Sequence, residues 1–467
     1  MNRLSDTEAV SNAIQDSQSG RSFKTAAALN PSGNERRRAT PNVVFMISDD
    51  QTWTDYGFMG HPVIETPHLD RLARESFTFT RGYVPTSLCR PSLMTMISGL
   101  YPRQHLVTGN DPGVPEGVDR RKYRGRPEYR DLCKQLISNV DRVPTLPRLL
   151  KEKGYLSFQC GKWWEGNHQR GGFTHGMTHG DPARGGRHGD EGLKIGRKGM
   201  EPISRFLDEA RDQPFFIWYA PFLPHTPHNP PKRLLDKYQA KTGHLALAKY
   251  YAMCEWFDET CGELLGELKN RKLEEDTLVV YVTDNGWIQR TPDTRLPEGW
   301  FTQFAPKSKQ SPFDGGLRTP VMVKWPAKIR PGMDRKTLVS SIDMVPTVLK
   351  AVGLSVPEEL QGVDLLPHCT GSEPLQRPTL FGEIYAHDIA DLKDPSKSLL
   401  YEWCIHGNEK AILTYPGKLG PYRTIHSVVE KGPHYYDLEK DPHEENRLST
   451  PGVDFDKKFS AWRGQFK

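Results

Sequence analysis

Acidic side chains follow two apolar segments of the sequence. Asp49 and Asp50 come directly after the run at 43–47, and Asp284 and Asn285 follow the strand-like run that begins at Leu278. Because ligands in open α/β sheets bind beyond the carboxyl ends of the strands, we expect these four side chains to lie close together. Their oxygen atoms suit a hard divalent cation, Ca²⁺ or Mg²⁺. The alternative is that they only form turns or cap the following helices.

One cysteine stands in a segment that favours reactivity. Cys89 precedes Pro91, a residue suited to the start of a helix, and Gly99 is a typical helix stop. The pattern places Cys89 at or near a helix N-terminus, where the dipole favours an anion or a nucleophile. The alternative is a buried, inert thiol. The other cysteines are interpreted in that way, because the sequence shows no CxxC pair and no evident disulfide framework.

Apolar runs alternate with helical patterns along most of the chain, which predicts a mostly parallel sheet covered by helices on both sides. The Gly- and His-rich segment 166–192 has no periodicity and predicts a long surface loop near the site. The predicted strands are 43–47, 215–219, 278–282 and 321–323, and the predicted helices are 143–153, 200–212 and about 245–268.

The sequence divides into three parts. Residues 1–40, rich in Ser, Asn, Gln and Arg, predict a disordered tail. Residues 41–373 carry the alternating pattern and predict the catalytic α/β domain. Residues 374–467 predict a smaller C-terminal subdomain with an antiparallel sheet. Its strand-like pieces are 380–383, 411–415 and 434–438, followed by a helical pattern at 454–463.

The composition narrows the class of protein. Of 467 residues, 36% are hydrophobic and 26% charged, as in ordinary globular proteins. The net charge is only +5, and no dense basic stripe argues for nucleic-acid binding. No segment is long and apolar enough for a membrane span. The first forty residues contain no apolar signal-peptide core, so the sequence as given predicts a cytoplasmic protein, with export open if the chain starts elsewhere.

Several short motifs occur along the chain in a distinctive order. In chain order they are Asp49-Asp50, Cys89-x-Pro91-Ser92, Gly161-Lys162-Trp163, Pro224-His225, Asp284-Asn285-Gly286, Asp314-Gly315-Gly316-x-Arg318-x-Pro320, Asp343-Met344-Val345-Pro346-Thr347 and Tyr436-Asp437-Leu438-x-x-Asp441-Pro442-x-Glu444. This order resembles the type I sulfatases, the formylglycine-dependent sulfatases of the alkaline-phosphatase-like superfamily. The resemblance extends from about residue 41 to 446, and it is particularly clear for members that read Cys-Arg-Pro-Ser-Leu and Gly-Lys-Trp-Trp-Glu-Gly.

The resemblance implies an alkaline-phosphatase-like α/β sandwich, with a large mostly parallel sheet flanked by helices and a small C-terminal antiparallel sheet. It implies Ca²⁺, or less readily Mg²⁺, held by Asp49, Asp50, Asp284 and Asn285. In the family, the cysteine that matches Cys89 is oxidised to formylglycine by a maturation enzyme, and the hydrated aldehyde attacks sulfur. The residues that match family positions gripping sulfate oxygens or assisting the leaving alcohol are Lys162, His225 and Lys309.

Two positions differ from the family pattern. Leu93 stands where the maturation motif Cys-x-Pro-x-Arg has its arginine, and Trp164 stands where the family often has a histidine. We expect Arg90 to supply part of the missing positive charge to the substrate. An indole cannot accept a proton, so we expect a histidine from elsewhere in the chain to take that role. The candidates are His168, His175 and His228, of which His228 is assigned to substrate binding.

The sequence therefore predicts a sulfatase that hydrolyses sulfate esters, with sulfated carbohydrates as the expected substrates. Two alternatives stay open. One is a phosphoryl or phosphonate ester hydrolase that uses the same metal site. The other is a catalytically silent homologue that keeps the metal and binds anionic ligands.

Overall fold

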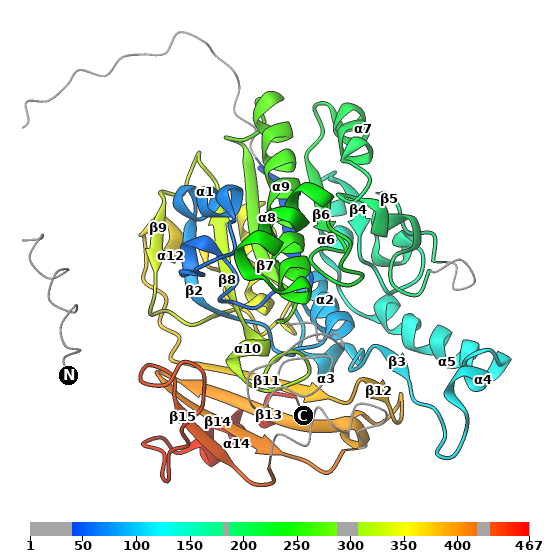
Figure 1. Ribbon diagram of the computed structural model, residues 1–467, viewed down its shortest axis with the longest axis vertical. Helices are drawn as coiled ribbons and strands as arrows, with labels where there is room; N and C mark the ends of the chain where they lie inside the picture. Colours follow the sequence, from blue (N-terminus) through cyan, green and yellow to red (C-terminus); the bar gives the residue numbers. More distant parts are fainter. Residues whose placement is uncertain (1–39, 181–185, 287–306, 418–429, 467) are drawn as a thin grey trace, which may run out of the picture. The chain divides into compact units, whose positions relative to one another are not determined.

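A nine-stranded sheet carries the predicted site at the ends of its central strands (Figure 1). The computed structural model describes residues 40–180, 186–286, 307–417 and 430–466. The strand order is β10-β2-β8-β7-β1-β6-β4-β5, with β9 beside β2, and only β8 runs antiparallel to its neighbours. The strands are β1 Asn42–Ser48, β2 Phe77–Tyr83, β4 Leu156–Gly161, β5 His175–Gly176, β6 Phe215–Ala220, β7 Thr277–Thr283, β8 Arg318–Lys324, β9 Gly332–Asp334 and β10 Val339–Ser340.

Residues along the central strands alternate between two apolar cores, which explains why their sequences are apolar without a break. In β1, Val44 and Met46 belong to one core, whereas Val43, Phe45 and Ile47 belong to the other. The first core is closed by helices α1 Pro67–Glu75, α7 Glu201–Ala210 and α9 Leu245–Asn270, with α8 Lys232–Thr242 against α9. The second contains residues from helices α2 Cys89–Ser98, α5 Pro127–Ile137, α6 Leu146–Lys151 and α11 Met344–Ala351.

A four-stranded antiparallel sheet follows in the chain, drawn orange to red in Figure 1. Its order is β11-β13-β14-β15, and residues of the last helix pack on it through a separate apolar cluster. A two-stranded parallel pair, β3 with β12, joins residue 111 to residue 388. These elements are β3 Asp111–Pro112, β11 Thr379–Tyr385, β12 Asp388–Ile389, β13 Leu399–His406, β14 Glu409–Thr414, β15 His434–Asp437 and α14 Phe455–Gly464. The other α-helices of the described residues are α3 Pro102–His105, α4 Arg120–Arg124, α10 Asp314–Leu317 and α12 Leu366–Thr370.

A buried charge cluster fastens the small sheet to the large one. The ammonium group of Lys410, on β14, lies 2.9 Å from Asp314 Oδ1 and 2.7 Å from Glu444 Oε1. The Glu444 carboxylate also accepts a 2.6 Å hydrogen bond from the Asp314 backbone, and the Tyr83 hydroxyl donates to Asp314 Oδ2. Since all these groups are buried, removal of any one would leave an uncompensated polar group. Two of the late motifs, around Asp314 and Glu444, therefore serve to join the sheets.

The structure confirms the predicted fold class, together with every strand and helix that the apolar patterns indicated. Helix α2 begins at Cys89 itself, so Pro91 lies two residues inside it, and Gly99 ends it with φ +74°. The segment 166–192 contains only short elements where it is described. Residues 1–39 lie outside the described residues, and the domain boundary at 373 stays a prediction. Within the described ranges, no helix has the length and apolar character that a membrane crossing needs.

Candidate active site

The four oxygen-bearing residues lie together at the carboxyl ends of two adjacent strands. β1 and β7 pair in parallel up to Ser48 and Thr283, so the residues that follow them emerge side by side. The Asp50 backbone amide donates a 2.9 Å hydrogen bond to Asp284 Oδ1. The Asn285 side-chain amide donates at 2.6 Å to Asp50 Oδ1. Parallel pairing therefore brings together two groups that are 234 residues apart in the chain.

Asp50 has a left-handed backbone conformation with φ +66°. Residues other than glycine adopt this conformation rarely, at a cost of about 1–3 kcal/mol, and such residues cluster at functional sites. The turn ends β1 abruptly while both Asp49 and Asp50 stay buried at 3% and 1% exposure. The hydrogen bonds to Asp284 and Asn285 hold the strained residue in place.

Two buried lysines face these carboxylates. Lys162 Nζ lies 2.7 Å from Asp49 Oδ1 and 4.0 Å from Asp284 Oδ2. Lys309 Nζ lies 2.5 Å and 2.7 Å from the two Asp50 oxygens. Burial lowers the pKa of each ammonium, but the neighbouring carboxylates outweigh it and raise the pKa above its usual value. Both lysines are therefore charged in a site from which water is largely excluded.

Unusual backbone conformations position these two lysines. Gly161 has φ +95°, and a side chain there would lie 1.9 Å from the Ala220 carbonyl oxygen, so only glycine lets β4 pass β6 and present Lys162. Lys309 lies in a tight turn between Lys307 and Gln310, both with positive φ. The Gln310 amide donates to the Ser87 carbonyl, which ties this turn to the segment before Cys89.

Cys89 is the first residue of α2, and its thiol faces the carboxylates. Its Sγ atom lies 3.8 Å from Asp50 Oδ1, and the residue is 1% exposed. Ser92, one turn further, donates to the Asp284 carbonyl at 2.7 Å and so anchors the helix to β7. Burial raises the pKa of the Cys89 thiol to about 12, although Lys162 and Lys309 oppose it. The thiol is therefore neutral near pH 7 and a poor nucleophile in this form.

His225 completes the group from the segment after β6. Its Nε2 lies 3.3 Å from Asp50 Oδ2, and its ring stacks on Phe222 at 4.3 Å. Its Nδ1 lies 2.7 Å from the Thr226 carbonyl oxygen, which can only accept, so Nδ1 carries a proton. Burial lowers the pKa of His225 well below its usual value, against the opposing effect of Asp50. Nε2 is therefore the nitrogen that can exchange a proton with a bound molecule.

The oxygen set fits a divalent cation. Three buried oxygens, Asp49 Oδ2, Asp284 Oδ2 and Asn285 Oδ1, have no hydrogen-bond partner among the described residues. Buried oxygens without partners are costly, and these three belong to residues that also match the preferred ligands of Ca²⁺. Ligand atoms of Asp49, Asp50, Cys89 and His225 also lie within 4.8 Å of one another. The residues present therefore provide a possible metal site.

The charge balance at the site also favours a bound cation. Three carboxylates face only two ammonium groups, so one negative charge is not balanced by lysine. Burial raises the pKa of Asp49 and raises that of Asp284 well above its usual value, despite Lys162. A bound cation would stabilise both carboxylates in their charged form.

Arg90, which we expected to supply positive charge to the substrate, pairs instead with another side chain of the protein. Its guanidinium forms a two-pronged ion pair with Glu165, with both N–O distances at 2.7 Å, and both side chains are buried. A third donor reaches the Asn110 carbonyl oxygen. Because most of its donors are taken by the protein, the contacts favour a positioning role for Arg90 and do not support it as a substrate ligand.

The histidines proposed to replace the family residue at Trp164 lie in three different settings. His168 Nδ1 faces the Thr178 carbonyl oxygen, and His175 pairs with Glu209 at 3.2 Å. Only His228 borders the site: its ring lies 5.6 Å from that of Tyr250, whose hydroxyl lies 3.5 Å from the Asp50 carbonyl oxygen. Burial lowers the pKa of His228 to about 3, so it is neutral.

A further histidine was missed from the sequence. The His188 ring lies 5.3 Å from both the Trp164 and Phe222 rings, and Lys162 is close enough to lower its pKa. Burial is the larger cause and brings that pKa to about 3. Its Nδ1 has no partner among the described residues. His188 lies inside the segment interpreted as an irregular loop, where no local pattern marks one histidine over another.

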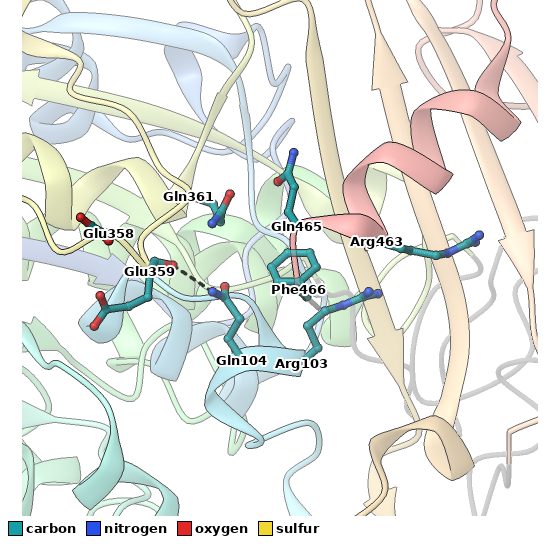
Figure 2. Close-up of a pocket in the computed structure, with 8 residues that line it drawn as sticks. All are labelled: Arg103, Gln104, Glu358, Glu359, Gln361, Arg463, Gln465 and Phe466. Carbon is teal, nitrogen blue, oxygen red and sulfur yellow. Dashed lines mark hydrogen bonds between the residues drawn. The ribbon is translucent and has the colours of Figure 1, made fainter.

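A separate cavity of about 850 Å³ lies elsewhere, between α3 and the C-terminal helix (Figure 2). At the edge of this cavity, the Gln104 side-chain amide donates a hydrogen bond to the Glu359 carbonyl oxygen. Its two arginines are already engaged, Arg103 by Glu383 and Glu402, and Arg463 by Glu402. None of the predicted catalytic or metal residues lines this cavity.

Comparison with known proteins agrees with this fold and site. A family model described as Sulfatase matches residues 41–354, and one described as N-sulphoglucosamine sulphohydrolase, C-terminal, matches residues 302–452. The chain belongs to the sulfatase family, whose members are sulfuric ester hydrolases of the alkaline-phosphatase-like superfamily.

Individual relatives of the chain are also named as sulfatases. N-acetylgalactosamine-6-sulfatase of Canis lupus familiaris is 28% identical over 480 residues, 92% of this chain and 85% of its own. Arylsulfatase A of Bos taurus is 30% identical over 386 residues, 73% of this chain and 70% of its own. A solved structure from work on glycosaminoglycan metabolism by Bacteroides thetaiotaomicron is similar with a TM-score of 0.69 at 20% identity, covering 92% of this chain and 100% of that chain.

Proposed function

We propose that this sulfatase removes sulfate from sulfated carbohydrates, with Cys89 converted to formylglycine and with Ca²⁺ held by Asp49, Asp50, Asp284 and Asn285. The observation that carries the proposal is the convergence, in a chain of the sulfatase family, of two buried lysines and three buried oxygens on a cysteine at a helix start; these oxygens have no hydrogen-bond partner among the described residues. The substrate class rests on the named relative, a sulfatase of N-acetylgalactosamine.

Conversion of Cys89 to formylglycine would replace a thiol of low reactivity by a better nucleophile. With its pKa raised to about 12, the thiol is a poor nucleophile in the folded protein. Formylglycine, made by an oxidising maturation enzyme, instead offers a hydrated aldehyde with two hydroxyl groups. One hydroxyl oxygen loses its proton and bonds to sulfur as the bond from sulfur to the alcohol oxygen breaks, and the alcohol leaves with a proton on that oxygen. The other then loses its proton, the aldehyde reforms, sulfate leaves, and water restores the hydrate.

The remaining side chains have distinct roles. The ammonium groups of Lys162 and Lys309 stabilise negative charge on the sulfate oxygens, an effect that is stronger in a buried site than in water. Neutral His225 takes a proton at Nε2 from the attacking hydroxyl and passes it to the leaving alcohol, because its own proton is held on Nδ1 by the Thr226 carbonyl oxygen. A bound metal would supply further positive charge and favour ionisation of the attacking hydroxyl.

Two measurements test the proposal together. Protein from the native host is digested with trypsin, and the peptide 82–103, which contains the Arg90-Pro91 bond that trypsin spares, is analysed by mass spectrometry. The same protein is assayed with an aryl sulfate, a sulfated disaccharide, an aryl phosphate and a phosphonate monoester. We expect formylglycine at position 89 and turnover of the sulfate esters above the other two.

Other outcomes decide between the alternatives. Faster turnover of the phosphonate or phosphate ester would assign the site to phosphoryl-type chemistry. An unmodified thiol with no turnover of any ester would make the chain a silent homologue that binds anions.

Replacement of His225 by alanine is expected to lower kcat for a sulfated disaccharide by about 10²- to 10⁴-fold, the usual contribution of a general acid or base. His175→Ala is the matched control, since His175 pairs with Glu209 and packs on Phe206, and it should leave kcat unchanged. Circular dichroism checks that both variants fold. Equal kcat values for the His225 variant and the wild type would remove His225 from the mechanism.

A further inference from the structure

Three arginines converge on one carboxylate beside the active site. Arg187 forms a two-pronged pair with Asp111, at 2.8 Å from Nε and 2.5 Å from Nη2. Arg124 reaches the same carboxylate at 2.7 Å, and Arg120 lies 3.9 Å from it. The Asp111 side chain is only 5% exposed, whereas the arginines keep 41%, 34% and 29% of their side-chain surface in solvent for Arg187, Arg124 and Arg120. One face of this arginine cluster is thus open to a ligand.

The cluster has a surplus of positive charge. Asp388, which pairs with Asp111 across β3 and β12, is the second carboxylate and binds Arg120 at 2.8 Å. His387 adds no charge at neutral pH, because burial lowers its pKa against the effect of Asp388. Among the described residues, three guanidinium groups therefore face two carboxylates. Although Asp111, His387 and Asp388 lie close enough to hold a metal ion, the arginines already neutralise the carboxylates and would repel a cation.

The cluster is physically continuous with the active site through Trp164. Arg187 Cζ lies 4.5 Å from the centre of the Trp164 ring, and Lys162 Nζ lies 5.8 Å from it. The separation of these two cations cannot exceed the sum of those distances, which one disaccharide can span. Asn110, which precedes Asp111, accepts a hydrogen bond from the Arg90 backbone, so the cluster is also tied to the start of α2.

We propose that the arginine cluster, with Arg187 as its principal residue, binds a second acidic group of the substrate. The group is a carboxylate or a second sulfate on the sugar that carries the cleaved ester or on its neighbour. A guanidinium that is oriented by Asp111 and by the Trp164 ring, and that keeps 41% of its side-chain surface in solvent, can bind either oxyanion through charge-assisted hydrogen bonds. The inference rests on the proposed function and narrows it to saccharides with more than one negative charge.

Steady-state kinetics of Arg187→Ala test the inference. The substrates are three sulfated disaccharides that differ only in the neighbouring sugar, which is neutral, bears a carboxylate or bears a second sulfate. We expect kcat/KM to fall roughly 10- to 100-fold for the doubly charged substrate that fits, and at most about threefold for the neutral one. The substrate with the larger loss in kcat/KM shows whether the cluster binds a carboxylate or a second sulfate. Arg187→Lys should recover only part of the loss, since lysine keeps the charge but not the paired donors.

Arg170→Ala is the matched control, because Arg170 has 40% side-chain exposure and forms a two-pronged pair with Asp141. It should leave all three kcat/KM values unchanged. Equal losses for the neutral and charged disaccharides in Arg187→Ala, or no loss in any, would overturn the inference.

A binding measurement separates this inference from the proposed function. The whole protein is titrated calorimetrically with the desulfated, carboxylate-bearing disaccharide and with its disulfated counterpart. Weaker binding by Arg187→Ala and not by Arg170→Ala supports the subsite even if the wild type hydrolyses no sulfate ester. Unchanged binding of both ligands counts against the subsite even if the wild type is an active sulfatase.

Discussion

Asp284→Ala is expected to abolish metal binding and to reduce sulfate ester turnover to background. Asp284 is fully buried, one of its oxygens has no hydrogen-bond partner among the described residues, and the other fixes the strained backbone of Asp50. A bound ion stabilises only the folded state, by about 2.7 kcal/mol when its concentration is a hundredfold above its Kd. The wild type should therefore gain this stability when Ca²⁺ is added after chelation, and the variant should not.

Elemental analysis of the purified proteins and thermal unfolding with and without Ca²⁺ provide the measurements. Asp258→Ala is the matched control, since Asp258 is a buried carboxylate that likewise accepts two backbone hydrogen bonds, from His68 and Leu69. That variant loses stability but should keep its metal and its Ca²⁺-dependent gain. Wild-type metal content in Asp284→Ala would exclude Asp284 as a ligand.

Cys89→Ala is expected to lower kcat by about 10⁴-fold or more, as removal of a covalent nucleophile does in other hydrolases. Alanine cannot be oxidised to an aldehyde, so no attacking oxygen is formed. The substitution shortens one small buried side chain, and the stability should fall by only about 1 kcal/mol. Loss of activity would thus come from chemistry and not from unfolding.

Cys261→Ala is the control for this second result, because Cys261 is a fully buried thiol in the core formed with α9. It should show a similar change in unfolding temperature with unchanged kcat. If Cys89→Ala retained most of the wild-type activity, the nucleophile would have to come from another group, and the formylglycine proposal would be lost.

The two positions that differ from the family pattern can now be described by their contacts. Leu93 is 5% exposed and belongs to the apolar core on the α2 side of the sheet. Trp164 is equally buried and forms a wall contacted by Lys162 and Arg187. The first change fills the core, whereas the second replaces a polar side chain by a ring that both Lys162 of the reacting centre and Arg187 of the arginine cluster contact.

The sequence by itself determined the fold class and indicated which acidic side chains lie together. Apolar runs at 43–47 and 278–282 predict buried strands because a strand covered on both faces needs apolar residues at every position. Asp49, Asp50, Asp284 and Asn285 could be placed together from sequence, since the carboxyl ends of parallel strands share one edge of the sheet. Cys89 could be placed at a helix start from Pro91 and Gly99.

The tertiary structure alone decided which groups these residues face. Arg90 is paired with Glu165, 75 residues away, and Arg187 with Asp111, 76 residues away, and neither pairing has a local signal. His188 and Arg187 come from a segment without periodicity, so their place beside Trp164 follows from how that segment folds over β4. A short pattern records secondary structure because it reflects local burial, whereas ion pairs between distant segments depend on how the whole chain packs.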